Sequence, residues 1–240
     1  MKSLLSGIAL GLIAMHVSAQ QAPDVPRFST MRPGSVPQGW KPFALSSTKK
    51  STEYMLVTED GTVVLRAMAH NAASALAYKV DFDPRQFPMI SFRWKVAQGI
   101  PDANNADVTK EDSPLRVMIA FEGDTSKINL KDKIASSVAQ TASGQPLPYA
   151  TLMYIWGNKV PVNKVTISGR SSRIRMLALN ADEEGVGKWQ SFTRNLVDDF
   201  KMAFGEEPGK VVGLELLTDT DNTGGNTEAF YGDITIGPPR

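Results

Sequence analysis

Residues 53–69 read EYMLVTEDGTVVLRAMA, and this stretch decides the fold class. Two short runs rich in β-branched, aromatic and other apolar residues flank Asp60-Gly61, a strong signal for the two-residue turn of a β-hairpin. The flanking runs predict strands over 53–58 and 62–69. An antiparallel strand pair is therefore the first unit that the sequence predicts.

The same pattern of short apolar runs continues through the rest of the chain after Phe28. Short runs of Val, Ile, Phe, Tyr and Thr are bounded by Gly, Pro, Asn and Asp, which is typical of all-β proteins. The further predicted strands cover residues 74–80, 88–96, 115–121, 151–156, 163–168, 173–179, 189–194, 210–217 and 230–236. No internal repeat and no long linker divides the chain, so we expect residues 28–240 to form a single antiparallel β-sandwich domain.

Two segments depart from the strand pattern. Residues 195–204 place Leu196, Phe200 and Phe204 four apart, on one face of a helix, and Gly205 follows as a helix stop. This spacing predicts one short helix packed on the sandwich. Residues 127–144 are rich in Lys, Ser and Ala, and we expect them to form a polar, partly helical insertion.

The first 19 residues have the features of a secretory signal peptide. One lysine precedes an apolar run from Leu4 to Val17, and Val17-Ser18-Ala19 supplies the small residues of a cleavage site. The run is shorter than the roughly 20 residues that a membrane span needs. We therefore expect a periplasmic or secreted protein with no integral membrane segment after leader removal, and a flexible lead-in over residues 20–27.

Composition excludes several functional classes. Removing the leader removes one Lys and no acid, so the 26 basic residues become 25 against 25 acidic residues. A chain without net charge does not suit nucleic-acid binding. The absence of cysteine excludes thiolate chemistry, and His70 is the only histidine left outside the leader, which excludes a multi-histidine metal site.

Several motifs, in a fixed order, resemble a known family. They are PQGWK (37–41), SFRWKV (91–96), DSPLRVMIAF (112–121), YIW (154–156), the segment 194–205, TDTDNTG (218–224) and YGDI (231–234). Together they are similar to exported bacterial proteins of domain of unknown function (DUF) 3047, a resemblance that implies no activity. Two pairs differ from the expected pattern: Asp112-Ser113 in place of two acids, and Arg194-Asn195 in place of an Arg-Asp-like pair.

A looser resemblance concerns the fold. The strand pattern, closed by Tyr-Gly-Asp-Ile, is similar to jelly-roll carbohydrate-binding modules, which implies a jelly-roll-type sandwich and a structural calcium ion near the last strand.

Alternation along the central strands indicates a ligand surface. Phe92, Trp94 and Val96 form one apolar set, which leaves Arg93 and Lys95 facing outward. Val117, Ile119 and Phe121 form a second set, which leaves Arg116 outward.

The aromatic residues of the next strand could extend this cationic face. If Met153 and Ile155 are buried, Tyr154 and Trp156 join these cations, and the combined face would suit an acidic sugar. Two alternatives stay open: the aromatic pair as core, and the arginines in structural ion pairs with Asp107, Glu111 or Asp112.

The loop after residue 217 is dense in short oxygen-bearing side chains. Asp219 and Asp221 stand two residues apart, as carboxylate ligands of a hard cation often do. We expect a calcium site in which Asn222 or loop carbonyl groups and Asp233 complete the ligand set. The alternative is a plain turn whose side chains bind backbone amides.

These features give three functional hypotheses and no catalytic residue. The first is an exported, non-catalytic binding module for a glycan of the envelope or environment. The second is a polysaccharide lyase or glycoside hydrolase that uses Arg93, Arg116, Tyr154 and His70 in an open groove. The third is a structural envelope protein that binds another protein.

Overall fold

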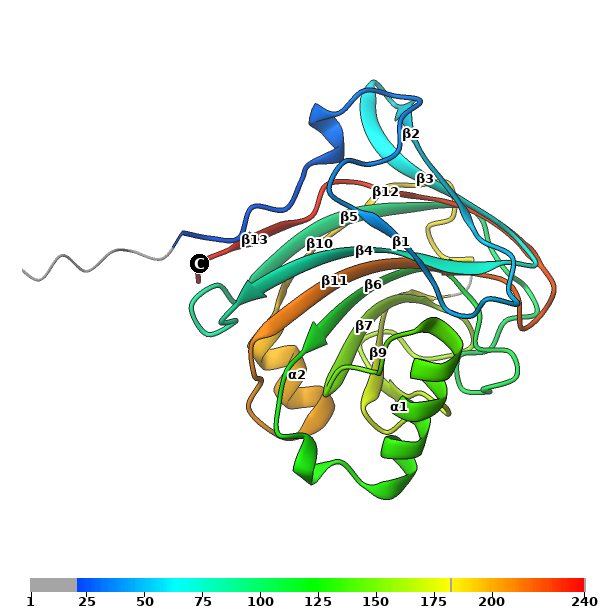
Figure 1. Ribbon diagram of the computed structural model, residues 1–240. Helices are drawn as coiled ribbons and strands as arrows, with labels where there is room; N and C mark the ends of the chain where they lie inside the picture. Colours follow the sequence, from blue (N-terminus) through cyan, green and yellow to red (C-terminus); the bar gives the residue numbers. More distant parts are fainter. Residues whose placement is uncertain (1–20, 182, 240) are drawn as a thin grey trace, which may run out of the picture.

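The computed structural model describes residues 21–181 and 183–239 as two packed β-sheets with two helices (Figure 1). The strands are β1 (Lys41–Ala44), β2 (Glu53–Glu59), β3 (Thr62–His70), β4 (Ala73–Phe82), β5 (Met89–Gln98), β6 (Ser113–Phe121), β7 (Ala150–Gly157), β8 (Val165–Ile167), β9 (Ile174–Ala181), β10 (Gln190–Asn195), β11 (Val211–Asp219), β12 (Asn226–Tyr231) and β13 (Thr235–Gly237). The helices are α1 (Leu130–Ser143) and α2 (Leu196–Phe204), with 3-10 turns at Phe28–Thr30 and Thr125–Lys127. The predicted all-β sandwich is confirmed.

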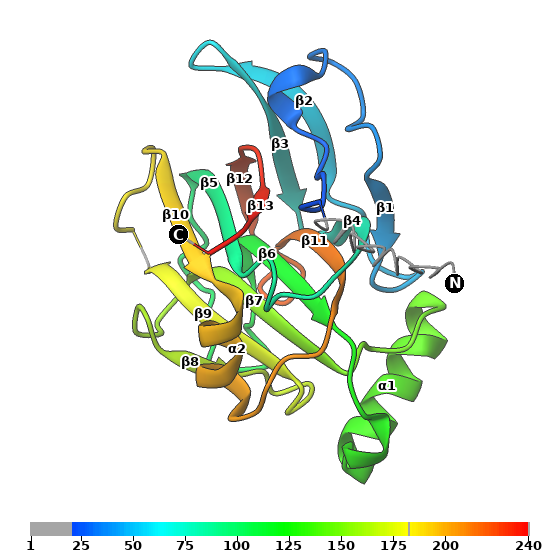
Figure 2. The same ribbon diagram turned by 90° about the vertical axis from the view of Figure 1, so that its left-hand side faces the viewer.

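The two sheets have different strand orders. The seven-stranded sheet runs β1-β4-β11-β6-β7-β9-β8, and the six-stranded sheet runs β10-β5-β12-β3-β2, with β13 also paired to β5. All strand pairs described are antiparallel except β7 and β9, which are parallel. Figure 2 shows the sheets edge-on, with α1 beyond the seven-stranded sheet and on the side away from the six-stranded sheet.

The predicted hairpin forms as expected. Glu59 pairs with Thr62 across the turn. Both turn residues have positive φ, 49° at Asp60 and 77° at Gly61, which the primed two-residue turn requires.

A shared apolar core joins the two sheets. Phe92, Trp94 and Val96 of β5 lie in it together with Ile119 and Phe121 of β6, so the predicted inward sets are confirmed. The core also includes Val25 at one end of the sequence and Ile236 at the other.

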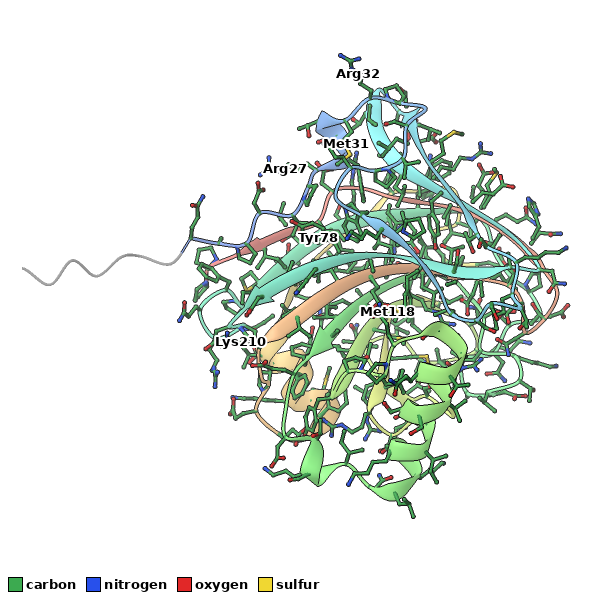
Figure 3. All side chains as sticks on the ribbon, in the orientation of Figure 1. Arg27, Met31, Arg32, Tyr78, Met118 and Lys210 are labelled. Carbon is green, nitrogen blue, oxygen red and sulfur yellow. The ribbon has the colours of Figure 1, made fainter. Side chains whose placement is uncertain are left out.

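The segment before Phe28, which we predicted to be a flexible lead-in, contacts the sandwich at two residues. Val25 is buried in the core, and the backbone carbonyl of Asp24 accepts a hydrogen bond of 3.0 Å from the hydroxyl of Tyr78, a residue that Figure 3 labels. Burial of Val25 therefore fixes this segment against the sandwich. The predicted signal peptide, residues 1–19, lies outside the described residues.

Two further elements differ from the prediction. Strand β1 was not predicted, and the strand predicted over 230–236 is two strands, β12 and β13, separated at Gly232-Asp233. The insertion at 127–144, which we predicted to be partly helical, contains α1 as a second helix beside the predicted packed one. No helix in the described ranges is long and apolar enough to cross a membrane.

The predicted helix is α2. Its first turn is capped by Asn195, whose side-chain oxygen accepts hydrogen bonds from the backbone amides of Val197 and Asp198. Gly205 ends the helix with φ of 72°. Phe200 packs on Phe121 of β6 with ring centroids 4.6 Å apart, which fixes the helix to the core.

Candidate functional site

Arg93 and Lys95 point away from the core on β5, as the alternation of this strand predicted. They lie on the outer face of the six-stranded sheet, and each is close to an aromatic ring. The guanidinium carbon of Arg93 lies 4.4 Å from the ring centroid of Trp189, and the ammonium of Lys95 lies 5.2 Å from that of Phe230. We call these four residues the aromatic–cation cluster.

Backbone pairing assembles this cluster from β5, β12 and the residue just before β10. Strand β10 pairs with β5 so that Gln190 stands opposite Trp94, which brings Trp189 beside the neighbouring outward positions. Strand β12 pairs with β5 so that Phe230 stands opposite Lys95. Trp189 and Phe230 were missed because only this pairing shows that they flank Arg93 and Lys95.

Two acidic side chains fix Lys95 and Trp189. Lys95 forms ion pairs with Glu59 and, at 3.3 Å, with Asp60. The indole N–H of Trp189 donates a hydrogen bond of 2.9 Å to Asp60. This bond, with those from Lys95, lowers the pKa of Asp60. Burial tends to lower the pKa of Lys95, but the hydrogen bonds and charges of Glu59 and Asp60 reverse the shift and raise it.

Arg93 is positioned differently, by stacking. Within residues 21–181 and 183–239, no hydrogen bond or ion pair engages its guanidinium, whose neighbour is the ring of Trp189. Gly232 makes room for the side chain, since a Cβ atom at that position would lie 2.5 Å from Cγ of Arg93. The result is a pre-positioned arginine on the outer sheet face whose N–H donors have no partner in the described part of the chain.

The same face continues over β3 and β2. Arg66 forms an ion pair of 2.6 Å with Glu228 next to the cluster. Arg66 also lines a groove of about 330 Å³ whose other lining residues are Gly34, Ser35, Val36, Glu53, Tyr54, Met55 and Met68. The outer face thus offers aromatic rings, cations, carboxylates and a groove in one continuous surface.

Tyr154 and Trp156 do not lie on the predicted ligand surface. Both are fully buried between the sheets, and the ring of Tyr154 lies 5.6 Å from that of Phe92. The hydroxyl of Tyr154 donates a hydrogen bond of 2.7 Å to Asp199, which also pairs with Arg194. The alternative in which these rings belong to the core is therefore the right one.

Arg116 is also absent from the predicted surface, because it belongs to the other sheet. Its side chain is only 2% exposed, and it forms an ion pair of 3.1 Å with Asp219. It donates as well to the backbone carbonyl of Glu111. Arg116 is thus in structural ion pairs, one with Glu111 at 3.9 Å, which the sequence suggested, and a closer one with Asp219, which it did not.

The residues suggested for a lyase do not share a groove. His70 is exposed on β3, where its Nδ1 lies 2.9 Å from the side-chain oxygen of Asn226. Tyr154 is in the core, Arg116 is on the seven-stranded sheet, and Arg93 is on the outer face of the six-stranded sheet. No base–arginine pair for the lyase reaction is assembled from these four residues.

The acidic loop brings two of the predicted metal ligands together with one that was missed. Oxygen atoms of Asp112, Asp219 and Asp221 lie within 4.8 Å of one another. Asn222 directs its side-chain oxygen to Arg170 at 3.3 Å. Asp233 lies beyond the other end of β12, where it accepts a hydrogen bond of 2.9 Å from the backbone amide of Ser29. Asp233 is therefore not part of this cluster.

Each of the three carboxylates already has a polar partner. Asp112 accepts from the backbone amides of Asn222 and Thr223 at 3.1 and 2.8 Å, which closes the loop. Asp221 pairs with Lys49. Burial raises the pKa of Asp219 to about 6, against the opposing effect of Arg116. One carboxylate oxygen, Oδ1 of Asp221, is buried with no hydrogen-bond partner among the described residues.

Comparison with solved structures finds similar sandwiches of low identity. An arabinose-bound MgGH51 α-L-arabinofuranosidase is 8% identical with a TM-score of 0.43, over 89% of this chain and 26% of that one. The family 30 carbohydrate-binding module of the cellulosomal cellulase Cel9D-Cel44B of Clostridium thermocellum is 12% identical with a TM-score of 0.40, over 89% and 96%. A CBM4 module is 12% identical with a TM-score of 0.35, over 83% and 86%. The likeness is one of fold alone.

Comparison with sequences gives the family. A search of curated proteins finds no match. The family described as protein of unknown function (DUF3047) matches residues 38–235, which is most of the sequence. The chain therefore belongs to the DUF3047 family.

Proposed function

We propose that the protein is a non-catalytic module that binds an acidic glycan on the outer face of its six-stranded sheet. The observation that carries the proposal is Arg93, which is stacked on Trp189 and has no carboxylate partner among the described residues. A guanidinium held in this way binds a carboxylate through two parallel hydrogen bonds. The indole beside it offers an apolar surface for a sugar ring.

The remaining groups on this face suit an extended ligand. Lys95, Arg66 and Glu228 supply further donors and acceptors for hydroxyl groups, and the groove under residues 34–36 continues the path. We infer that binding takes place in the periplasm or outside the cell, because residues 1–19 have the pattern of an export signal.

Calorimetric titration with oligosaccharides tests the proposal. Oligogalacturonate and alginate fragments supply carboxylates, and xylo- and cello-oligosaccharides serve as neutral probes. We expect Arg93→Gln to weaken binding of the acidic probe about ten- to a hundredfold, because it removes charge-assisted hydrogen bonds. Trp189→Ala should weaken binding of acidic and neutral probes alike.

Arg85→Gln is the matched control, since Arg85 is an exposed arginine paired with Asp83 on a turn away from this face. It should leave binding unchanged. Equal affinities for wild type and Arg93→Gln, or no binding of any acidic probe, would contradict the proposal.

We infer in addition that the acidic loop holds a structural calcium ion. Three carboxylates converge there, and the unpaired buried oxygen of Asp221 is a ligand atom without a partner in the described chain. Asp221 and Asp112 would hold the ion together with Asp219, with Lys49 giving up its contact. A calcium ion would add positive charge beside carboxylates that Arg116 and Lys49 neutralise only in part.

A thermal-shift titration tests the calcium site. An ion that binds only the folded chain raises the melting temperature, so calcium should stabilise the wild type and EDTA should reverse the effect. Asp221→Asn should remove the response, whereas Asp81→Asn, at an exposed ion pair on the strand β4, should keep it. If millimolar calcium leaves the melting temperature of the wild type unchanged, the calcium site is contradicted, and the loop is only a turn held in place by Arg116 and Lys49.

A further inference from the structure

Helix α1 is attached to the sandwich by its polar side. Asp132 is buried, and its Oδ1 accepts hydrogen bonds of 2.8 Å from both the Ser171 hydroxyl and the Ser172 backbone amide. One turn later, the hydroxyl of Ser136 accepts a hydrogen bond of 3.1 Å from the backbone amide of Leu147. These contacts fix which side of the helix faces the protein body.

The opposite side of α1 carries an apolar stripe that nothing described covers. Leu130, Ile134 and Val138 are spaced four apart and are 74%, 56% and 63% exposed. With Ser137 and Thr141 they line a shallow hollow in the surface. A surface helix normally turns such a stripe toward the core, so α1 has the reverse orientation.

Positive charges border this stripe. At about 100° per residue, Lys131 and Lys133 fall on either side of it, and both side chains are exposed. Lys127 lies just before the helix. Asp132 is the only acidic residue of α1, and it faces the body. The outward face of α1 is therefore an apolar centre with a cationic border.

We propose that α1 docks on an anionic phospholipid membrane surface, with Leu130, Ile134 and Val138 at the acyl boundary and the lysines at the lipid phosphates. An apolar stripe bordered by lysines is the pattern of helices that lie in the membrane interface. A second copy of the chain is a poorer occupant, because pairing through this face would bring lysines of both copies together.

The position of α1 determines how a docked molecule would be oriented on the membrane. The helix lies on the side of the seven-stranded sheet that faces away from the six-stranded sheet (Figure 2). A protein docked through α1 would therefore direct its aromatic–cation cluster away from the lipid. This inference goes beyond glycan binding and does not depend on it.

Vesicle sedimentation tests the proposal with the chain from residue 20 onward, which contains all the described elements. We expect binding to vesicles of phosphatidylcholine and phosphatidylglycerol, little binding to phosphatidylcholine alone, and weaker binding at high salt. The double variant Lys131→Glu, Lys133→Glu should lower the affinity at least about thirtyfold, since each lysine near an anionic surface contributes a factor of about five.

Ile134→Ser tests the apolar stripe and should also weaken vesicle binding. Met202→Ser is its control, because Met202 is an apolar residue of α2 that is 51% exposed. Unchanged far-UV circular dichroism shows that each variant folds. Two results would overturn the proposal: vesicle binding that the α1 variants leave unchanged or that never occurs, and light scattering that detects a dimer lost in Ile134→Ser.

Discussion

At the scale of single residues, alternation was most informative where one side of a strand is apolar and the other carries charged side chains. Strand β5 has apolar side chains on one side and Arg93 and Lys95 on the other, so the sequence predicted both orientations correctly. Strand β7 is buried on both faces, and all eight of its residues are buried. The alternation of β7 therefore carried no signal, and the orientation of Tyr154 could not be predicted.

Glu215 allows a prediction about pH. It lies on β11 between Ala77 of β4 and Met118 of β6, and burial raises its pKa from 4.5 to about 6. Because the folded-state pKa is the higher one, ionisation destabilises the fold as the pH rises from about 4.5 through 6. We expect Glu215→Gln to raise the free energy of unfolding at pH 8 by about 2 kcal/mol and to have no effect near pH 4.

Urea denaturation at both pH values measures this effect. Glu184→Gln, at an exposed position, is the control and should change stability little at either pH. A gain from Glu215→Gln of equal size at pH 4 and pH 8 would contradict the explanation by charge burial.

The pair of Arg116 and Asp219 gives a second prediction. Both side chains are buried, so Arg116→Met leaves an uncompensated carboxylate and should destabilise the fold by about 3–5 kcal/mol. Adding Asp219→Asn should recover part of this loss. Chemical denaturation of the double-mutant cycle measures the coupling.

The exposed pair of Lys210 and Asp81 is the comparison for this cycle. Lys210→Met should cost less than about 1 kcal/mol, because solvent screens that pair. Strictly additive effects of Arg116→Met and Asp219→Asn would show that the buried pair does not act as a unit.

At the scale of elements, turn and cap signals located most of the fold. Asp60-Gly61 predicted its hairpin, and the spacing of Leu196, Phe200 and Phe204 predicted α2. The segment of α1 was predicted only as a partly helical insertion, because its apolar stripe faces outward and is too sparse to resemble a core-facing helix. The break between β12 and β13 was not visible either, since the approach of Gly232 to Arg93 depends on strand pairing.

The cap of α2 supplies an element-scale prediction. Asn195 accepts from the amides of Val197 and Asp198, so Asn195→Ala should lower the free energy of unfolding by about 1 kcal/mol. Asn195→Asp keeps the accepting oxygen and should retain most of the stability, which also explains why the sequence tolerates Asn where the family resemblance suggests Asp. Thermal denaturation measures both variants, and equal losses would contradict a capping role.

At the scale of the whole molecule, the sandwich separates two surfaces. The aromatic–cation cluster lies outside the six-stranded sheet, and α1 lies beyond the seven-stranded sheet (Figure 2). Sequence alone could not assign Arg93 and Arg116 to different sheets, because both follow the same alternation on neighbouring predicted strands. The non-sequential strand order places the two arginines in different sheets and brings the ring of Trp189 next to Arg93.

The tryptophans provide the most direct test of glycan binding on the outer face. Of the four in the chain, Trp40, Trp94 and Trp156 are buried in the core, and Trp189 is part of the cluster. We would record the indole N–H signals by NMR while titrating oligogalacturonate, with Trp189→Phe to assign the reporter. The account predicts a shift of the Trp189 signal alone. Binding that shifts a core indole, or that leaves Trp189 unchanged, would contradict it.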